Sequence, residues 1–375
     1  MKSRGTAATI FVTAGVFSLS AVSGCDGSRS ASGGAPSDSS PVAASSIATQ
    51  KRIHKEWGRA MAKTPTRKGG CFKATHPSTT WEETPCGPPP SIPLVPAQAG
   101  PRASTFQVGN GGTADFASTV PGDISFAEGS FPAVSGVTSE NGLAPGFSLS
   151  GYSLQLNTNY ASHTALCNQG PNPSGCQAWQ QFAYLPGTVF IQYWLINYFA
   201  AAPTGTQSCP PGFTFDDNGY YVGTTIAHEY DCFATGSGSA GAPYYTAADL
   251  ADVALSGSAG NTDQVVLYHG GQAVAYTAPE SSVLGLYQWW QSAEFNVFGP
   301  GEGSAAVFNY GSTMAVQTVT DSADSTGTAC TAVSYTGETN NLSLVPNSCC
   351  PITGASPGIF FTQSNAPGAT AFPCP

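Results

Sequence analysis

The stretch VFIQYWLINY, residues 189–198, consists of β-branched, aromatic and other apolar residues with isolated polar ones, and it contains neither Gly nor Pro. This composition is typical of a β-strand. Residues 180–184, QQFAY, have the same character, and Pro186 and Gly187 between the two stretches are turn signals. The region therefore predicts two short strands separated by a turn.

Segments of this kind recur along the chain. Regular short strands between Gly- and Asn-rich turns indicate an all-β fold, here a jelly-roll-like antiparallel β-sandwich with disulfides. Residues 247–251 are the exception and predict one or two helical turns. The further predicted strands are residues 152–156, 264–268, 273–277, 293–298, 305–308, 313–319 and 358–362.

Charge is distributed very unevenly. All twelve Lys and Arg residues lie at or before Arg102, whereas residues 103–375 contain seventeen Asp or Glu and three His. Carboxylates without cationic partners repel one another as they ionise, so the compact form should gain from their protonation. This suits an acidic medium, although acidic secreted β-proteins in general share it. It argues against nucleic acid as a partner, because phosphate binding needs Lys or Arg.

The N-terminal residues predict export. Lys2 and Arg4 precede a largely apolar segment, residues 7–22, that runs into the sequence VSGC ending at Cys25. A small-residue site before Cys resembles the lipobox of bacterial lipoproteins, so Cys25 is predicted to carry lipid, with an ordinary cleavable signal as the alternative. We expect a cell-envelope lipoprotein or a secreted protein that contacts a membrane only through this anchor.

A basic segment separates this signal from the acidic region. Residues 51–69 carry Ile53, Trp57 and Met61 at four-residue spacing, which predicts a short amphipathic helix. Three placements stay open for this helix: on anionic lipid, packed on the acidic domain as a removable pro-segment, or free as a solvated linker. The predicted division of the chain is 1–25 signal peptide, 26–50 disordered Ser/Gly/Pro tether, 51–102 basic segment and Pro-rich flap (a possible pro-segment), and 103–375 acidic β-sandwich domain.

Ten cysteines follow Cys25, and an even number in an exported chain predicts disulfides. A metal site is not expected, because the chain has no CxxC pair and its His residues do not cluster with Cys. Local spacing suggests Cys71 with Cys86, Cys167 with Cys176 and Cys209 with Cys232, whereas Cys330, Cys349, Cys350 and Cys374 can pair in three ways.

Polar residues interrupt two strongly aromatic strands. With a period of two, Gln180 shares a face with Phe182 and Tyr184, while Gln181 lies on the other face. In the later strand Glu294 and Asn296 share a face. Desolvation should disfavour ionisation of Glu294, which as a general base could take a proton from water attacking a carbonyl. A glutamine amide could stabilise the oxyanion and orient that water, although all these side chains could instead be solvated.

The order of these segments resembles the glutamic peptidases of the eqolisin family and, more distantly, the neprosin group. Eqolisins hold the catalytic Gln on a Leu-Gln-Thr-Gly strand, followed by a Trp-Tyr-Glu-Trp strand, and the catalytic Glu on an Ala-Glu-Trp-Ile-Val-Glu strand. Here WQQF at 179–182, QYWL at 192–195 and AEFNV at 293–297 stand in those places. The resemblance implies a double-sheet β-sandwich, Glu294 as the catalytic carboxyl and Gln180 as its amide, or Gln181 if the register differs by one residue.

The sequence departs from the family in the strand that lines its substrate cleft, Trp-Val-Gly-Ile-Asp. Residues 152–157, YSLQLN, have neither the Trp nor the Asp, and Phe298 stands in the place of the second Glu of the Ala-Glu motif. These departures bear on substrate recognition. The predicted substrate-binding residues are Trp194, Tyr184, Trp290 and Asn296.

Two weaker candidates remain. The run Asp216-Asp217-Asn218-Gly219 reads as a turn, with calcium binding as the lesser alternative. Glu338 would be a second carboxyl only if the fold returned it to the cleft.

The combined prediction is an exported acid endopeptidase, monomeric and without a cofactor, that acts on a polypeptide substrate. The alternatives are a non-catalytic module that binds polysaccharide or a surface peptide through its Trp and Tyr strands, and a structural surface protein whose groove is filled by its own flap.

Overall fold

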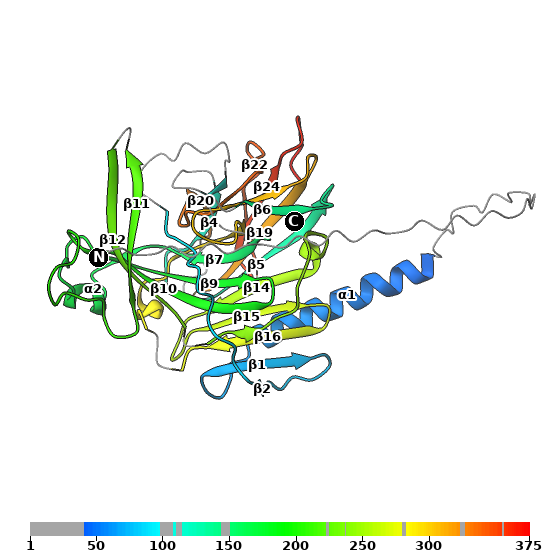
Figure 1. Ribbon diagram of the computed structural model, residues 1–375. Helices are drawn as coiled ribbons and strands as arrows, with labels where there is room; N and C mark the ends of the chain where they lie inside the picture. The colour runs from blue at the N-terminus through cyan, green and yellow to red at the C-terminus, as the bar shows by residue number, and fades with distance from the viewer. Residues whose placement is uncertain are drawn as a thin grey trace, which may run out of the picture. The chain divides into compact units, whose positions relative to one another are not determined.

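Two large antiparallel β-sheets form a sandwich (Figure 1). The computed structural model describes residues 41–97, 108–109, 115–143, 151–222, 225–236, 238–279, 283–322, 327–354 and 356–375. The predicted signal peptide and Cys25 lie outside these residues. Residues 46–375 form one compact unit, so the basic segment and the flap pack together with the acidic β-domain.

The first sheet has the strand order β2-β1-β16-β15-β14-β5-β19-β24-β22, with β23 also pairing with β24. The edge strand β2 and its neighbour β1 come from the flap, so this part of the flap belongs to the sandwich. The strands are β1 (Gly70–Thr75), β2 (Glu82–Thr84), β5 (Ile124–Ser135), β14 (Val253–Ser258), β15 (Gln264–His269), β16 (Gln272–Thr277), β19 (Thr313–Ser322), β22 (Ser343–Leu344), β23 (Cys350–Ile352) and β24 (Gly358–Ser364).

The second sheet has the order β11-β12-β10-β9-β7-β17-β4-β20, with β8 pairing with β9 and β13 with β10. Its strands are β4 (Asp115–Thr119), β7 (Ser153–Thr158), β8 (Ala161–Ser162), β9 (Gln177–Leu185), β10 (Thr188–Phe199), β11 (Thr214–Val222), β12 (Thr225–Thr235), β13 (Ala240–Gly241), β17 (Ser292–Phe298) and β20 (Ala329–Val333).

A small third sheet has the order β3-β21-β18-β6, and its β18–β21 pair is parallel. These strands are β3 (Val108–Gly109), β6 (Glu140–Leu143), β18 (Ala305–Phe308) and β21 (Thr339–Asn340). All nine strands predicted from the sequence are present, and the predicted helical turn is the 3-10 helix η1 (Ala247–Asp252). A second 3-10 helix, η2 (Leu286–Gln288), precedes β17.

The core lies between the two large sheets. Phe295 of β17 packs against Phe131 of β5, with 5.2 Å between the ring centroids. Glycines make room for the rings: a Cβ on Gly129 would lie 1.9 Å from Phe295 Cγ, and one on Gly257 would lie 2.3 Å from Phe182 Cδ2. Phe295 and Phe182 therefore face the other sheet, which fixes the direction of every alternate side chain on β17 and β9.

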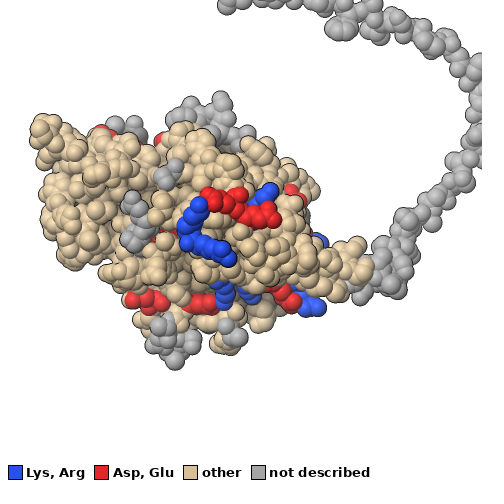
Figure 2. Space-filling view, turned by 90° about the horizontal axis from the view of Figure 1, so that it is seen from below, with Lys and Arg blue, Asp and Glu red and all other residues tan. Residues whose placement is uncertain are grey.

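The C-terminal part of helix α1 (Pro41–Ala62) packs on the first sheet. Trp57 and Met61 are buried there, so the helix is not a solvated linker. It begins ten residues earlier than the basic segment, because residues 41–50 of the predicted tether are helical. Figure 2 shows blue Lys and Arg side chains beside red Asp and Glu side chains on one face of the molecule. Lys68 forms an ion pair with Glu83 at 2.9 Å.

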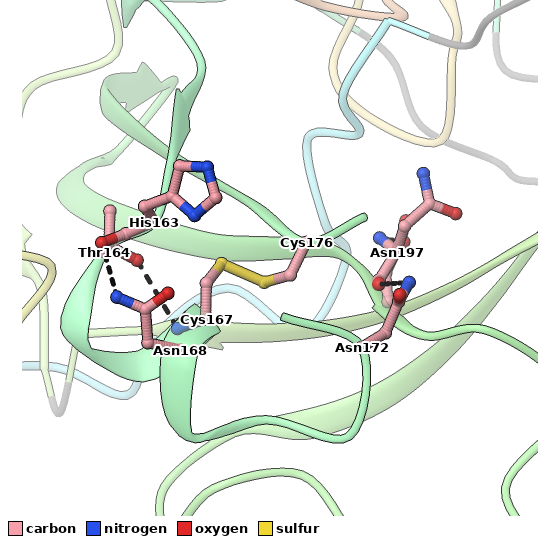
Figure 3. Close-up of a disulfide and its surroundings, with 8 residues drawn as sticks. His163, Thr164, Cys167, Asn168, Asn172, Cys176 and Asn197 are labelled. Carbon is pink, nitrogen blue, oxygen red and sulfur yellow. Dashed lines mark hydrogen bonds between the residues drawn. A yellow bond between two sulfur atoms is a disulfide. The ribbon is translucent and has the colours of Figure 1, made fainter. Parts of the chain in front are cut away.

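Five disulfides stabilise the sandwich. The three pairs suggested by spacing are present, and the last four cysteines pair as Cys330–Cys349 and Cys350–Cys374. Figure 3 shows how Cys167–Cys176 joins the short helix α2 (Ala165–Gln169) to the start of β9, with Asn172 Nδ2 donating to the Asn197 carbonyl at 2.8 Å. Five disulfides indicate an extracellular or otherwise oxidising compartment. No helix among the described residues is long and apolar enough to cross a membrane.

Candidate active site

The candidate site lies on the face of the second sheet that points away from the first sheet. Phe182 and Phe295 face the core, so Gln181 and Glu294, each one position away, lie on the opposite face. Strand β7 runs between β9 and β17, and its Asn157 pairs in register with both Gln181 and Glu294. Three neighbouring strands therefore bring an amide, a second amide and a carboxyl into one row.

Hydrogen bonds connect this row. Asn157 Nδ2 donates to Glu294 Oε2 at 2.8 Å, and Gln181 Nε2 donates to Asn157 Oδ1 at 3.1 Å. Gln181 Nε2 also donates to Gln155 Oε1 at 3.1 Å. Among the described residues, Gln181 Oε1 is buried and has no hydrogen-bond partner, so β9 carries a free acceptor two strands away from the carboxyl on β17.

The row continues to a second carboxyl. Gln155 lies two residues before Asn157 on β7, and its Nε2 donates to Glu338 Oε2 at 3.3 Å and to Ser153 Oγ at 2.9 Å. Glu338 also accepts from the Gly303 N–H at 3.1 Å and from the Thr336 hydroxyl. The fold thus returns Glu338 to the same face, which was the condition for counting it as a second carboxyl.

Burial controls the ionisation of Glu294. The side chain has no exposed surface, and burial raises its pKa from 4.5 to about 7, against the opposing hydrogen bonds from Asn157 and the Tyr335 N–H. The Tyr335 N–H lies 3.3 Å from both carboxyl oxygens. Desolvation of Glu294, expected from its aromatic setting, is confirmed.

A third buried carboxyl stands beside Glu294. Asp115 of β4 accepts from Asn296 Nδ2 at 3.0 Å, and burial, followed by the charge of Glu294, raises its pKa well above the usual value. Burial also raises the pKa of Glu338. Burial is the largest cause in each case, and it favours the neutral forms of all three carboxyls.

The preference for Gln180 over Gln181 is corrected by this geometry. Gln180 lies on the core side of β9, and its Nε2 donates to Asp263 Oδ2 at 3.1 Å. Gln181 is the amide that is linked to Glu294, through Asn157. Gln181, the register alternative, is therefore the glutamine that belongs to the candidate site.

Of the four predicted substrate-binding residues, Trp194 lies on the site face, and Asn296 alternates with the core-facing positions of β17 but is bound by Gln363 of β24 in the first sheet. Trp194 pairs in register with Trp179 next to the Gln192–Gln181 pair, and Asn296 binds Asp115 and Gln363. Tyr184 lies on the core side, where its hydroxyl donates to the Pro243 carbonyl at 2.9 Å.

Trp290 is likewise a core residue. It is fully buried, its ring packs 5.6 Å from that of Phe182, and its Nε1 donates to the Ser292 carbonyl. Trp290 therefore offers no exposed ring on which a ligand could stack. The buried placement follows from the Phe182 side of β9 facing the first sheet.

Sequence reasoning missed Gln155, Asn157, Gln192 and Asp115 as members of this group. A signal for two of them exists in residues 153–158, where Ser153, Gln155 and Asn157 alternate with leucines. The whole strand is buried, so the polar side of this alternation marks a second covered face and not a solvated one.

The described residues contain no cluster of three or more His, Cys, Asp or Glu side chains placed to hold a metal ion. The predicted Asp-Asp-Asn-Gly turn is instead part of strand β11, where Asp217 pairs with His228 at 2.7 Å. The side chains that meet at Glu294 are carboxyls, amides and hydroxyls, which can hold and transfer protons and bind a peptide backbone.

Three solved structures are similar to this chain. A Scytalido-glutamic peptidase with a peptide-based transition state analogue matches with a TM-score of 0.27 and 11% identity, covering 69% of this chain and 99% of its own. SCP-B, a member of the eqolisin family of peptidases in complex with the tripeptide Ala-Ile-His, matches with a TM-score of 0.26 and 10% identity over the same shares. No protein-family model and no curated protein matches the sequence.

Proposed function

We propose that this chain is an exported peptidase that hydrolyses peptide bonds with Glu294 as its proton-transferring carboxyl and Gln181 as the neighbouring amide. The observation that supports this most directly is the row Gln181–Asn157–Glu294, a buried carboxyl one amide away from a free buried acceptor. The chemistry needs no group beyond these side chains and a water molecule.

The ionised Glu294 takes a proton from water as the water oxygen bonds to the substrate carbonyl carbon. Gln181 Oε1 accepts a hydrogen bond from that water and orients it. The protonated Glu294 then delivers the proton to the leaving nitrogen, and the C–N bond breaks. Both N–H groups of Gln181 are engaged by Gln155 and Asn157, so stabilising the oxyanion requires one of these bonds to be exchanged when substrate enters.

The pH range of activity depends on how covered the site is. With a pKa of about 7, Glu294 holds its proton in acid and is a poor base there. Admitting solvent and substrate to the row would relieve desolvation and lower this pKa. Activity between about pH 2 and 5, as expected for an acid endopeptidase, therefore requires an uncovered site.

The polysaccharide-binding alternative has less support, because Tyr184 and Trp290 are buried in the core between the sheets. Export with a lipid anchor at Cys25, and a monomeric state, complete the proposal. Their basis is the N-terminal sequence and the acidic surface, together with the oxidising compartment that the disulfides indicate.

Replacing Glu294 by Gln tests the mechanism. The variant keeps the size of the side chain but cannot take a proton, so we expect cleavage of a denatured protein substrate to fall at least about 100-fold between pH 3 and 7. Glu140→Gln is the matched control, because Glu140 also has a pKa raised to about 7 by burial but lies on β6. Detectable cleavage that is equal in Glu294→Gln and the native chain would remove Glu294 from the mechanism.

A further inference from the structure

Residues 92–97 of the flap, IPLVPA, cover the site face. Leu94 and Val95 are almost completely buried although they belong to a Pro-rich connection. Val95 packs in a cluster with Trp179, Trp194 and Ile196, and Leu94 packs with Ala183 and Phe190. The second sheet thus presents two adjacent apolar subsites, and the chain itself fills both.

Hydrogen bonds to both side chains and main chain hold the backbone of this segment. The Leu94 N–H donates to Gln192 Oε1 at 3.0 Å, and the Val95 N–H donates to Glu338 Oε1 at 2.9 Å. The Val95 carbonyl accepts from the Gly337 N–H at 2.8 Å. Pro96 forms an antiparallel bridge with Thr336. Main-chain bonds combined with pockets for neighbouring side chains are the means by which proteins bind extended peptides.

The receiving segment is shaped for a chain at this position. A Cβ on Gly337 would lie 2.8 Å from Val95 Cγ2 and 2.9 Å from the Pro96 carbonyl oxygen. Any side chain larger than hydrogen would therefore push the strand away. The close approach of residues 95–96 depends on a glycine at this place.

The covering segment leads to the candidate catalytic row. Ala97 N–H donates to the Tyr335 carbonyl at 2.9 Å, and the N–H of the same Tyr335 donates to Glu294. Glu338 holds Val95 with one oxygen and Gln155 with the other. Tyr335, which binds the segment through its carbonyl, is therefore also hydrogen-bonded to Glu294, the carboxyl proposed to react.

We infer that residues 92–97 occupy the peptide-binding groove of this protein as an internal pseudo-substrate, and that the groove takes an extended peptide with a Leu-like and a Val-like side chain at adjacent positions. The inference rests on the proposed function for its meaning as substrate preference. Glu338 and Gln192 are then the acceptors for the substrate's backbone N–H groups, and Trp179 and Trp194 form the wall of the Val-type subsite.

The test uses a full-chain variant in which the strand is expelled. In Leu94→Asp/Val95→Asp, two ionised side chains would have to enter apolar subsites next to Glu338 at pH 7, so the segment leaves the groove. Ser91→Asp is the matched control, because Ser91 is exposed in the same connection. Both are made in the Glu294→Gln background, so that binding is measured without turnover.

The probe is a fluorescein-labelled peptide with blocked ends, Ser-Ile-Pro-Leu-Val-Pro-Ala, followed by fluorescence anisotropy. We expect it to bind the expelled-strand variant at least tenfold more tightly than the Ser91→Asp control, and a peptide with Asp in place of Leu and Val to bind at least tenfold more weakly. Adding Gly337→Ala should remove the gain, because the peptide meets the same Cβ. Equal, weak binding to both proteins would overturn the inference.

Near-ultraviolet circular dichroism shows whether the double variant folds. If it does not, Val95→Ala replaces it, and we again expect the peptide to bind this variant more tightly than the Ser91→Asp control. Equal, weak binding to both would again overturn the inference. The outcome also separates the two proposals. Peptide binding without any Glu294-dependent cleavage leaves the groove assignment intact and removes the peptidase mechanism. Glu294-dependent cleavage without peptide binding leaves the peptidase mechanism intact and removes the groove assignment.

Discussion

Gln180 and Gln181 leave β9 on opposite faces and end in different hydrogen-bond groups. Gln180 donates to Asp263 between the sheets, whereas Gln181 donates to Gln155 and Asn157 beside Glu294. Both side chains are fully buried. The two residues therefore have the same side chain, strand and burial, and they differ only in their hydrogen-bond partners.

Alanine at each position separates catalysis from stability. Gln181→Ala removes the free acceptor and loosens Asn157, so we expect the rate of peptide hydrolysis to fall about 100-fold. Gln180→Ala should leave the rate within about twofold while costing a similar free energy of unfolding, about 1–3 kcal/mol, since each deletion leaves a buried polar partner unpaired. Hydrolysis rates and urea unfolding of both variants check this, and a loss of rate that is larger for Gln180→Ala would contradict the assignment.

The sequence alone does not decide between these two glutamines. Alternation with a period of two assigns each to a face, but seven of the nine residues of β9 are buried and none is exposed, so neither face is marked by solvation. The faces of the two glutamines are decided by Gly129 and Gly257, which lie on two other strands. These glycines leave room for the rings of Phe295 and Phe182 on the core side. Only the packed structure brings these positions together.

At the scale of elements, α1 is joined to the first sheet by an ion pair that is buried on one side. Arg59 Nε lies 3.1 Å from Glu128 Oε1, and the Glu128 side chain has no exposed surface. The pairs Lys51–Asp252 and Lys63–Asp321, both at 2.6 Å, are largely exposed and contribute little. The attachment of the helix thus depends on Arg59 and on the apolar contacts of Trp57 and Met61.

Arg59→Ala would leave the Glu128 charge buried without its partner. We expect a loss of about 3–5 kcal/mol in the free energy of unfolding, against less than about 0.5 kcal/mol for Arg52→Ala, whose partner Glu56 is exposed on the same helix. Urea unfolding at pH 7 measures both. Equal, small losses would mean that α1 is not part of the cooperative unit.

The strands were more predictable than the segments that cover them. Alternation and turn residues located all nine predicted strands, because strand formation is governed by neighbours in the chain. The covering segment 92–97 carries no such signal: three of its six residues are Pro or Ala, and its place depends on Glu338, Gly337 and Gln192, which lie about 100 to 240 residues later. Contacts of that separation leave no periodicity to detect.

For the whole molecule, the lack of cations after Arg102 has a structural counterpart in several buried carboxyls with raised pKa values. Burial raises the pKa of Glu294 and of Glu140 to about 7 and that of Asp216 to about 6, and it also raises those of Asp115, Asp231 and Glu338. The folded protein therefore binds more protons than the unfolded chain between about pH 4 and 7.

Stability should consequently decrease as pH rises through this window. The contribution of each such carboxyl is fully present below its unfolded pKa, near 4.5 for Glu294, and is lost as pH approaches its folded value of about 7, which for Glu294 alone amounts to about 3 kcal/mol. We expect the Tm to be highest near pH 4 and to fall by roughly 10 °C or more by pH 7. Calorimetry from pH 3 to 8 measures this, with Glu140→Gln as the variant in which the fall is smaller, and a Tm that rises steadily from pH 4 to 7 would show that the buried carboxyls do not govern the stability of this fold.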